Sequence, residues 1–288
     1  MRERYVIALG GNAISDHTLH KISYLIALEN RKGNEIVITH GNGPQVGELA
    51  SIENKNLAIL TAQTQAEIGL NIETSLINAD SSLENRVAVV LTRVYVDKND
   101  PEFRNPSKPI GRFYNRKLKA NIKNKEMVFK NLIHGYRRVV PSPYPLSIPE
   151  LSLIENLLKK RYIVIACGGG GIPIFKSNNT KIMANAVIDK DAVSSLLASD
   201  LDADKFIILT NVDGAFLNFG KKNQKHIRTI NYSQSDYYVS EKQFEEGSML
   251  PKVKACMSFV KRTGKPASIG SINKPADAFR YKSTVITP

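Results

Sequence analysis

Residues 5–12 join a short apolar run directly to a pair of glycines: Tyr5-Val6-Ile7-Ala8-Leu9-Gly10-Gly11-Asn12. An unbroken apolar run of this length predicts a strand that is covered on both faces. Glycines at its end predict a turn where backbone N–H groups can approach a ligand closely. Similar units recur around residues 35–44 and 162–173, with amphipathic stretches between them. This alternation predicts the α/β class, with an open, mostly parallel sheet sandwiched by helices.

Eight strands are expected from runs rich in Val and Ile. A helix is expected between the first two strands, because Leu19, Ile22 and Ile26 recur at helical spacing before Gly33. Asp191 is interpreted as the N-terminal cap of a later helix. The expected strands are Tyr5–Leu9, Glu35–Thr39, Val87–Val96, Arg138–Val140, Tyr162–Ala166, Phe206–Thr210, Pro266–Ile269 and Thr284–Ile286.

The stretch from about residue 100 to residue 135 breaks this rhythm. It contains Pro101, Pro106 and Pro109, and residues 104–130 carry nine basic side chains against one acid, Glu126. We predict a single domain over residues 1–288, with a small protruding lobe inserted at about 100–135. The length of 288 residues is enough for such a domain to bury a substantial core.

Composition limits the classes of function. The formal net charge of +13 allows a nucleic acid, a membrane surface or a small anion as partner, but no aromatic-rich motif accompanies the basic segment. Nucleic acid is therefore an unlikely partner. No run of eighteen apolar residues occurs, so we expect no membrane span and a cytoplasmic protein. The two cysteines, Cys167 and Cys256, lack the spacing of a zinc site or a disulfide framework, and no protein-ligated metal is expected.

Three glycine-rich turns follow apolar strands, at residues 10–12, 40–44 and 168–173. In an open parallel sheet, ligands bind beyond the carboxyl ends of the strands. The sequence contains no Walker motif, and the third position of a dinucleotide fingerprint falls on Pro173. Phosphoryl transfer by rigidly held cations fits better. Three lysines stand in unusual contexts for this role: Lys108 among prolines, Lys190 between two aspartates, and Lys252 after Gly247-Ser248-Met249-Leu250-Pro251.

Taken together, these motifs resemble the carbamate kinases, which have the amino-acid kinase fold, and the resemblance extends over almost the whole chain. The stretches that carry it are Ala8–Ala13 (ALGGNA), Thr39–Gly47 (THGNGPQVG), Ser107–Gly111 (SKPIG), Gly135–Pro143 (GYRRVVPSP), Ala166–Pro173 (ACGGGGIP), Ala186–Asp191 (AVIDKD), Thr210–Phe219 (TNVDGAFLNF) and Gly247–Val253 (GSMLPKV).

The resemblance implies reversible phosphoryl transfer between ATP and carbamate, with ATP formed from ADP and carbamoyl phosphate in the favoured direction. It implies that Lys108, Lys190 and Lys252 contact the phosphoryl groups and that Asp191 orients the lysines. The implied cradle for the acceptor and phosphoryl oxygens is Gly10, Gly11, Asn12, Asn42, Gly43, Gly169 and Gly170. The implied adenosine side is Asn211, Asp213, Phe216 and Met249. It also implies Mg²⁺ held mainly by the ATP or ADP phosphates, arginine metabolism and a homodimer.

The sequence departs from the family pattern at a few positions. The connection after Asn12 is short, Asn211 stands where the family has an aspartate, and Leu250 stands where it has a glycine. Related kinases for acetylglutamate or aspartate have a lysine just before the first glycine pair, where this chain has Ala8-Leu9. Two alternatives stay open: an acylphosphate kinase of the same fold with another small carboxylate or phosphate acceptor, and a noncatalytic nucleic-acid-binding protein.

Overall fold

A central sheet of eight strands organises the molecule, which we describe from a computed structural model of residues 2–10, 16–53, 55–115, 127–132, 135–177 and 180–288. The strands are adjacent in the order β15-β17-β16-β12-β1-β2-β9-β3, and all pairs are parallel except β16 with β17. Their bounds are β1 Arg4–Leu9, β2 Glu35–His40, β3 Val87–Val89, β9 Ile163–Ile165, β12 Lys205–Thr210, β15 Thr229–Asn231, β16 Ala267–Ser271 and β17 Thr284–Thr287. The predicted open, mostly parallel sheet is confirmed.

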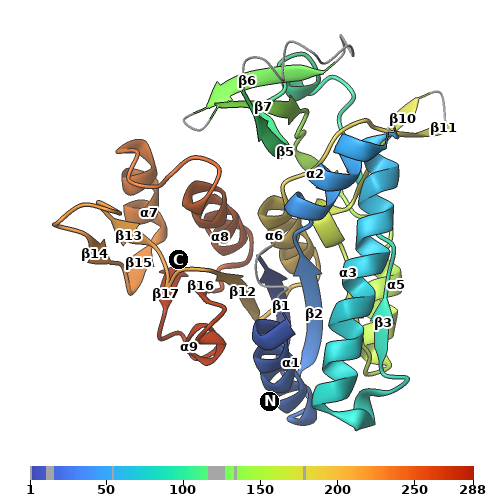
Figure 1. Cartoon of the computed structure of the whole chain (residues 1–288). Coiled ribbons are helices and arrows are strands. Elements are labelled where there is room, and N and C mark those ends of the chain that lie inside the picture. Colours follow the sequence, from blue (N-terminus) through green and yellow to red (C-terminus); the bar gives the residue numbers. More distant parts are fainter. Residues whose placement is uncertain (1, 11–15, 54, 116–126, 133–134, 178–179) are drawn as a thin grey trace.

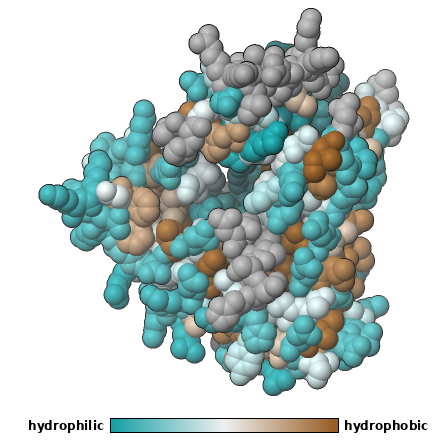
Figure 2. Space-filling model, viewed as in Figure 1, coloured by the Kyte–Doolittle hydropathy of each residue, from teal (hydrophilic) through white to brown (hydrophobic). Residues whose placement is uncertain are grey.

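Helices cover both faces of this sheet (Figure 1). Helices α1, α3 and α9 pack on one face, while α5, α6 and α8 pack on the other. The helices are α1 Asp16–Arg31, α2 Gly43–Ile52, α3 Leu57–Ala79, α5 Leu151–Lys159, α6 Lys190–Asp200, α7 Tyr232–Ser240, α8 Met249–Thr263 and α9 Pro275–Phe279. The surface seen from the same side is mostly hydrophilic, with scattered hydrophobic residues (Figure 2).

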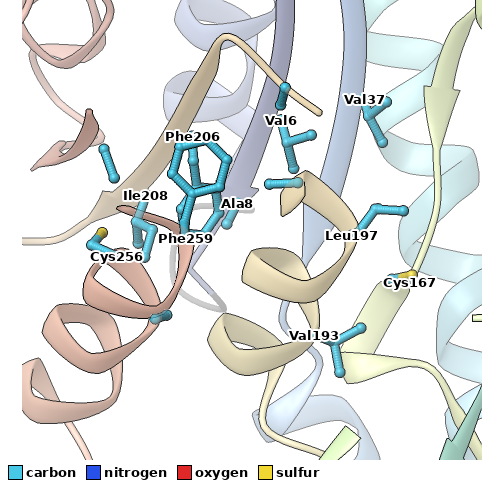
Figure 3. Packing of buried hydrophobic residues seen from close by; sticks show 14 of the residues in the cluster. Val6, Ala8, Val37, Cys167, Val193, Leu197, Phe206, Ile208, Cys256 and Phe259 are labelled. Atoms are coloured by element: carbon cyan, nitrogen blue, oxygen red, sulfur yellow. The ribbon is translucent and has the colours of Figure 1, made fainter. Parts of the chain in front are cut away.

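The alternation of side chains along β1 builds both halves of the core. Tyr5, Ile7 and Leu9 point to the face covered by α1 and α3, whereas Val6 and Ala8 point to the face covered by α6 and α8. The second face is shown in Figure 3, where Phe206 of β12 packs against Phe259 of α8 with their ring centroids 5.5 Å apart. Truncating either ring to alanine would cost about 3–5 kcal/mol.

The two cysteines lie in this packed interior. Cys167 and Cys256 are both free and buried, as expected of small apolar residues. Burial raises the pKa of the Cys256 thiol well above its ordinary value, which keeps it uncharged.

The expected single strand over Val87–Val96 is instead two strands. β3 ends at Val89 in the central sheet, and β4 (Arg93–Val96) belongs to a second sheet with β8 (Pro145–Ser147), β10 (Ile172–Ser177) and β11 (Thr180–Met183). The backbone N–H of Thr92, between the strands, donates to Gln65 Oε1 of α3 at 2.9 Å. The Gln65 side chain therefore takes the place of a strand as hydrogen-bond acceptor for Thr92. Because Gln65 is distant in sequence, no local pattern indicates this break between the strands.

A small antiparallel sheet of three strands, β5-β7-β6, lies at the top of Figure 1, and we call it the lobe sheet. Its strands are β5 Lys108–Tyr114, β6 Val128–Leu132 and β7 Gly135–Val140. Five of the nine basic residues of the segment lie at residues 116–126, outside the described residues. The division of the chain into one domain with a lobe at about 100–135 stays a prediction.

The lobe sheet packs on α2 without intervening side chains at one point. A Cβ atom placed on Gly47 of α2 would clash with the backbone of Gly111 in β5. Arg137 Nε donates to the Gly111 carbonyl at 2.9 Å, and Arg138 Nη1 donates to Ala50 O in the last turn of α2 at 3.2 Å. The first residue of β5, Lys108, is consequently held near the N-terminus of α2.

Candidate active site

A cavity of about 360 Å³ lies where the carboxyl ends of β1, β2 and β12 meet α2, α6, α8 and the lobe sheet. The face in Figure 2 is hollowed between the lobe sheet and the body of the molecule. Nine residues selected from the sequence line this one cavity although they span most of the chain: Gly10, Asn42, Gly43, Lys108, Gly169, Lys190, Asp191, Asn211 and Lys252.

Three helices begin at this cavity. Residues of the first turn of α2, α6 and α8 line it, including Gly43, Lys190 and Lys252. The caps of α2 and α8, Asn42 and Ser248, make no side-chain hydrogen bond to their own helices. Because free N–H groups and a positive partial charge gather at helix N-termini, the arrangement favours an anionic ligand.

Two lysines and one aspartate form a largely buried, hydrogen-bonded cluster at the cavity. Asp191 Oδ1 accepts from Lys190 Nζ at 2.7 Å, and Oδ2 accepts from Lys252 Nζ at 3.2 Å. The three side chains are 4%, 13% and 14% exposed for Asp191, Lys190 and Lys252 respectively. One carboxylate therefore fixes two ammonium groups, one from α6 and one from α8, in a largely water-free position.

Burial and charge act in opposite directions on this cluster. Burial would raise the pKa of Asp191, but the ammonium groups of Lys190 and Lys252 outweigh it and hold that pKa at about 2. Burial lowers the pKa of Lys190, and Asp191 opposes this shift. Asp191 is therefore an anion at every pH at which the protein is expected to work.

The predicted cap of α6 was wrong by two residues. Asp189, not Asp191, is the N-terminal cap, and its Oδ1 accepts from the backbone N–H groups of Asp191 at 2.9 Å and Ala192 at 3.2 Å. The other oxygen, Oδ2, accepts from Lys108 Nζ of the lobe sheet at 2.6 Å. Asp191 lies inside the first turn, where its side chain turns into the buried lysine cluster instead.

The two glycine turns beyond β2 and β9 fit closely against each other. Gly169 has a φ of +63°, and a Cβ atom there would overlap the side-chain amide of Asn42. Asn42 Nδ2 donates to Thr64 Oγ1 at 2.9 Å. Gln65 Nε2 donates to the carbonyls of Thr92 and Gly168 at 3.1 and 3.0 Å. Side chains of α3 thus support both turns from behind.

His40, directly before the second glycine turn, is buried against Gly168. Its Nδ1 lies 3.1 Å from the Gly41 carbonyl, to which the protonated nitrogen donates. Burial, aided by the charge of Lys190, lowers the pKa of His40 to about 4. The imidazole is therefore neutral near pH 7 and orients the turn through its bond to the Gly41 carbonyl.

The residues assigned to adenosine lie mainly beside the cavity. Phe216 and Met249 line a small, mostly apolar neighbouring cavity of about 50 Å³, and Ser248 belongs to both cavities. Asp213 and Phe216 line a third cavity, to which His226 also contributes. Phe216 and His226 belong to the β13–β14 hairpin, formed by Phe216–Leu217 and Lys225–His226. The site residues thus extend from the lysine cluster toward an apolar recess.

Of the predicted cradle residues that the structure describes, Gly170 alone does not line the cavity. Gly11 and Asn12 lie outside the described residues. Gly170 packs against the segment just before α6, where a Cβ atom would clash with the Ile188 carbonyl, so glycine at this position permits close packing.

Sequence reasoning missed several residues that build the site. Asp189 was noted only as a neighbour of Lys190, although the repeated acid on both sides of one lysine was a usable signal. Thr64, Gln65 and Thr92 carry no local signal, because they act through contacts with turns far away in sequence.

The described residues offer no dedicated metal site. No group of three or more His, Cys, Asp or Glu side chains within the described ranges is arranged to hold a metal ion. Asp191 is occupied by two lysines and Asp189 by Lys108 and the α6 amides. A search of the described helices likewise finds none that is long and apolar enough to cross a membrane.

A cavity with three lysines, three helix N-termini and glycine turns at the end of a parallel sheet is suited to binding and transferring phosphoryl groups. The amino acid kinase family model matches residues 3–271, and the chain belongs to this family.

Within the family, several relatives similar to this chain are carbamate kinases. A carbamate kinase from Thermoplasma volcanium is 41% identical over 99% of each chain, and carbamate kinase 2 from Staphylococcus aureus is 42% identical over 90% of each. A solved structure from Aeropyrum pernix K1 has a TM-score of 0.89 at 40% identity, covering 99% of each chain. The carbamate kinase from Giardia lamblia bound to AMP-PNP has a TM-score of 0.88 at 33% identity, covering 99% of this chain and 98% of the other. The chain is a member of the carbamate kinases.

Proposed function

We propose that this protein is an ATP-dependent phosphotransferase that interconverts ADP plus carbamoyl phosphate with ATP plus carbamate. The observation that carries the proposal is the convergence of Lys108, Lys190 and Lys252 on one cavity, two of them fixed by Asp191. A relative of known structure binds AMP-PNP, and we extend nucleotide binding to this chain.

In the ATP-forming direction, an oxygen of the ADP β-phosphate attacks the phosphorus of carbamoyl phosphate. A new P–O bond forms to ADP while the P–O bond to carbamate breaks, and the carbamate oxygen leaves with the electron pair. No phosphoenzyme is formed. Three ammonium groups neutralise the charge on the transferred group, and their fixed positions avoid reorganisation during transfer.

The other predicted site residues fall into two groups, one for the acceptor and phosphoryl oxygens and one for adenosine. Gly10, Gly11, Asn12, Asn42, Gly43, Gly169 and Gly170 are proposed to cradle the acceptor and the phosphoryl oxygens, with Gly170 acting through packing. Asn211, Asp213, Phe216 and Met249 are proposed to lie toward adenosine, and the apolar recess lined by Phe216 and Met249 supports this direction.

The proposal includes Mg²⁺, which would bind together with the nucleotide. Because the carboxylates of the cavity are already paired with lysines, the ion would be held mainly by phosphate oxygens and water. It would supply further neutralisation of phosphate charge. A homodimer and a role in arginine metabolism stay predictions from the family resemblance, and a cytoplasmic location stays a prediction from the absence of a long apolar run in the sequence.

The test is ATP formation from ADP and carbamoyl phosphate in the presence of Mg²⁺, followed by a luciferase assay. We expect turnover that depends on both substrates. Acetyl phosphate and other small acylphosphates serve as comparison donors. If one of them is used far better than carbamoyl phosphate, the acceptor assignment is wrong, and if none is used, the kinase activity itself is wrong.

A further inference from the structure

Lys108 is held at the cavity by the carboxylate of Asp189, which also caps helix α6. Lys108 Nζ lies 2.6 Å from Asp189 Oδ2, and Asp189 Oδ1 caps α6 through the N–H groups of Asp191 and Ala192. The two oxygens of Asp189 thus join the lobe sheet to the helix that carries Lys190.

Two adjacent carboxylates divide three lysines between them. The side chain of Asp191 faces the buried pair Lys190 and Lys252, whereas the side chain of Asp189 faces Lys108. The Lys108 and Asp189 side chains are 34% and 24% exposed, so they border solvent, unlike the buried pair. The sequence Asp189-Lys190-Asp191 therefore organises all three ammonium groups from one helix start.

We propose that Asp189 is a positioning residue, which acts through Lys108 and rests on the proposed kinase function. An ammonium group has three donors, so Lys108 can keep its bond to Asp189 and still direct donors to a phosphoryl oxygen. A lysine without this partner would spread over many rotamers, because its side chain has four rotatable bonds. Asp189 removes that freedom before the substrate arrives.

Asp189 is better fixed than a carboxylate in an ordinary surface ion pair. Such pairs contribute little because both side chains must be immobilised to form them. Here the capping hydrogen bonds already immobilise Asp189, and the start of β5 immobilises the Lys108 backbone through its pairing with Val140. The ion pair then orders the Lys108 side chain and adds a second anchor, to α6, for the start of β5.

The variant Asp189→Asn separates the two roles. Asparagine caps helices as well as aspartate does, so the α6 start is kept while the negative charge that holds Lys108 is lost. Asp189→Ser is a second variant, because serine also caps a helix but its hydroxyl is too short to hold Lys108. The unfolding temperature of each variant is expected to lie within a few degrees of that of the wild type.

The activity experiment is a double-mutant cycle with Lys108→Ala, measured as kcat and KM for carbamoyl phosphate and ADP. We expect Asp189→Asn to lower kcat on the order of ten- to a hundredfold. The same change in the Lys108→Ala background should have no further effect, because the group it positions is gone. A merely structural role would lower both backgrounds equally.

Hydrogen exchange gives a readout that is independent of turnover. Amides of β5 should exchange faster in Asp189→Asn and Lys108→Ala, and equally so in both. Three outcomes would overturn the proposal. The first is a kcat that is unchanged or increased in Asp189→Asn, and the second is an equal loss of kcat when Asp189→Asn is added to Lys108→Ala. The third is unchanged exchange of the β5 amides. A wild type that forms no ATP would instead refute the kinase function, and the exchange experiment would still decide whether Asp189 anchors Lys108.

Discussion

The side-chain amide of Asn42 lies against the backbone of Gly169, so that no Cβ atom fits between them. These residues follow two neighbouring strands, β2 and β9, that are separated by more than a hundred residues in sequence. Their contact joins the second and third glycine turns into one wall of the cavity. The wall is therefore a tertiary feature, although each turn is visible in the sequence.

Replacing Gly169 with alanine tests this contact. Alanine must adopt a φ of +63° and displace Asn42, so we expect the free energy of unfolding to fall by about 2–4 kcal/mol, together with a loss of activity. Gly220→Ala is the matched control, because Gly220 has a φ of +77° but nothing within 4 Å of an added Cβ. Denaturation in urea measures both. Equal losses would show that backbone strain alone explains the effect.

Replacing Lys252 with alanine tests the proposed catalytic charge. We expect kcat to fall on the order of a hundred- to a thousandfold or beyond detection, because one of the cations facing the transferred phosphoryl group is removed. The fold should persist, since Asp191 keeps its bond to Lys190. Circular dichroism checks the fold and coupled ATP formation checks the rate.

Lys254→Ala is the control for this prediction. Lys254 belongs to the same helix, is exposed and does not line the cavity of about 360 Å³ that holds Lys190 and Lys252. It should retain near-normal turnover. If Lys252→Ala also retained it, the assignment of Lys252 to phosphoryl transfer would be abandoned.

The alternation of apolar runs and glycine turns was enough to predict the fold, because strands covered on both faces need little else to be recognised. The lysines were found from their neighbours in sequence. The family resemblance implied Asp191 as their partner, but Asp189 as the partner of Lys108 was missed, because Asp189 and Asp191 are both acids at a helix start. Only the arrival of Lys252 from α8 and Lys108 from the lobe sheet decides which acid caps and which pairs with the buried cations.

The buried His40 predicts how stability changes with pH. Its pKa is about 4 in the folded protein against an ordinary value of 6.5. As pH falls from 6.5 to 4, the unfolded chain binds a proton that the folded protein does not bind. Stability therefore falls across this window, by about 3 kcal/mol in total.

The variant His40→Asn should remove this dependence, because Asn Nδ2 can replace Nδ1 as donor to the Gly41 carbonyl without titrating. Urea denaturation at pH 7, 6 and 5 measures the slope. Asp191, with a pKa of about 2 against an ordinary 3.8, contributes stability that is lost only below about pH 4, outside the window. Identical slopes in the variant and the wild type would contradict the burial effect at His40.

Thr64 of α3 does not line the cavity, but we predict that it affects acceptor binding through Asn42. Its hydroxyl accepts from Asn42 Nδ2 and is itself fully buried. Thr64→Val keeps the shape of the side chain but leaves the Asn42 amide without this partner, at a cost of about 1–3 kcal/mol in stability. Once released, Asn42 no longer faces the cavity in one fixed orientation. KM for carbamoyl phosphate should therefore rise about tenfold with a smaller change in kcat.

The control lies one turn earlier on the same helix. Thr61 is equally buried, but its hydroxyl has no hydrogen-bond partner in the described part of the chain. Thr61→Val therefore breaks no hydrogen bond and should leave stability equal or slightly higher, with KM unchanged. Both substitutions make the same chemical change in the same helix, so the difference between them reports on the hydrogen bonds of the Thr64 hydroxyl. This hydroxyl also donates to the Leu60 and Thr61 carbonyls within α3, and its bond to Asn42 is the one that reaches the cavity. Equal KM values in the two variants would mean that Thr64 fills space without orienting Asn42.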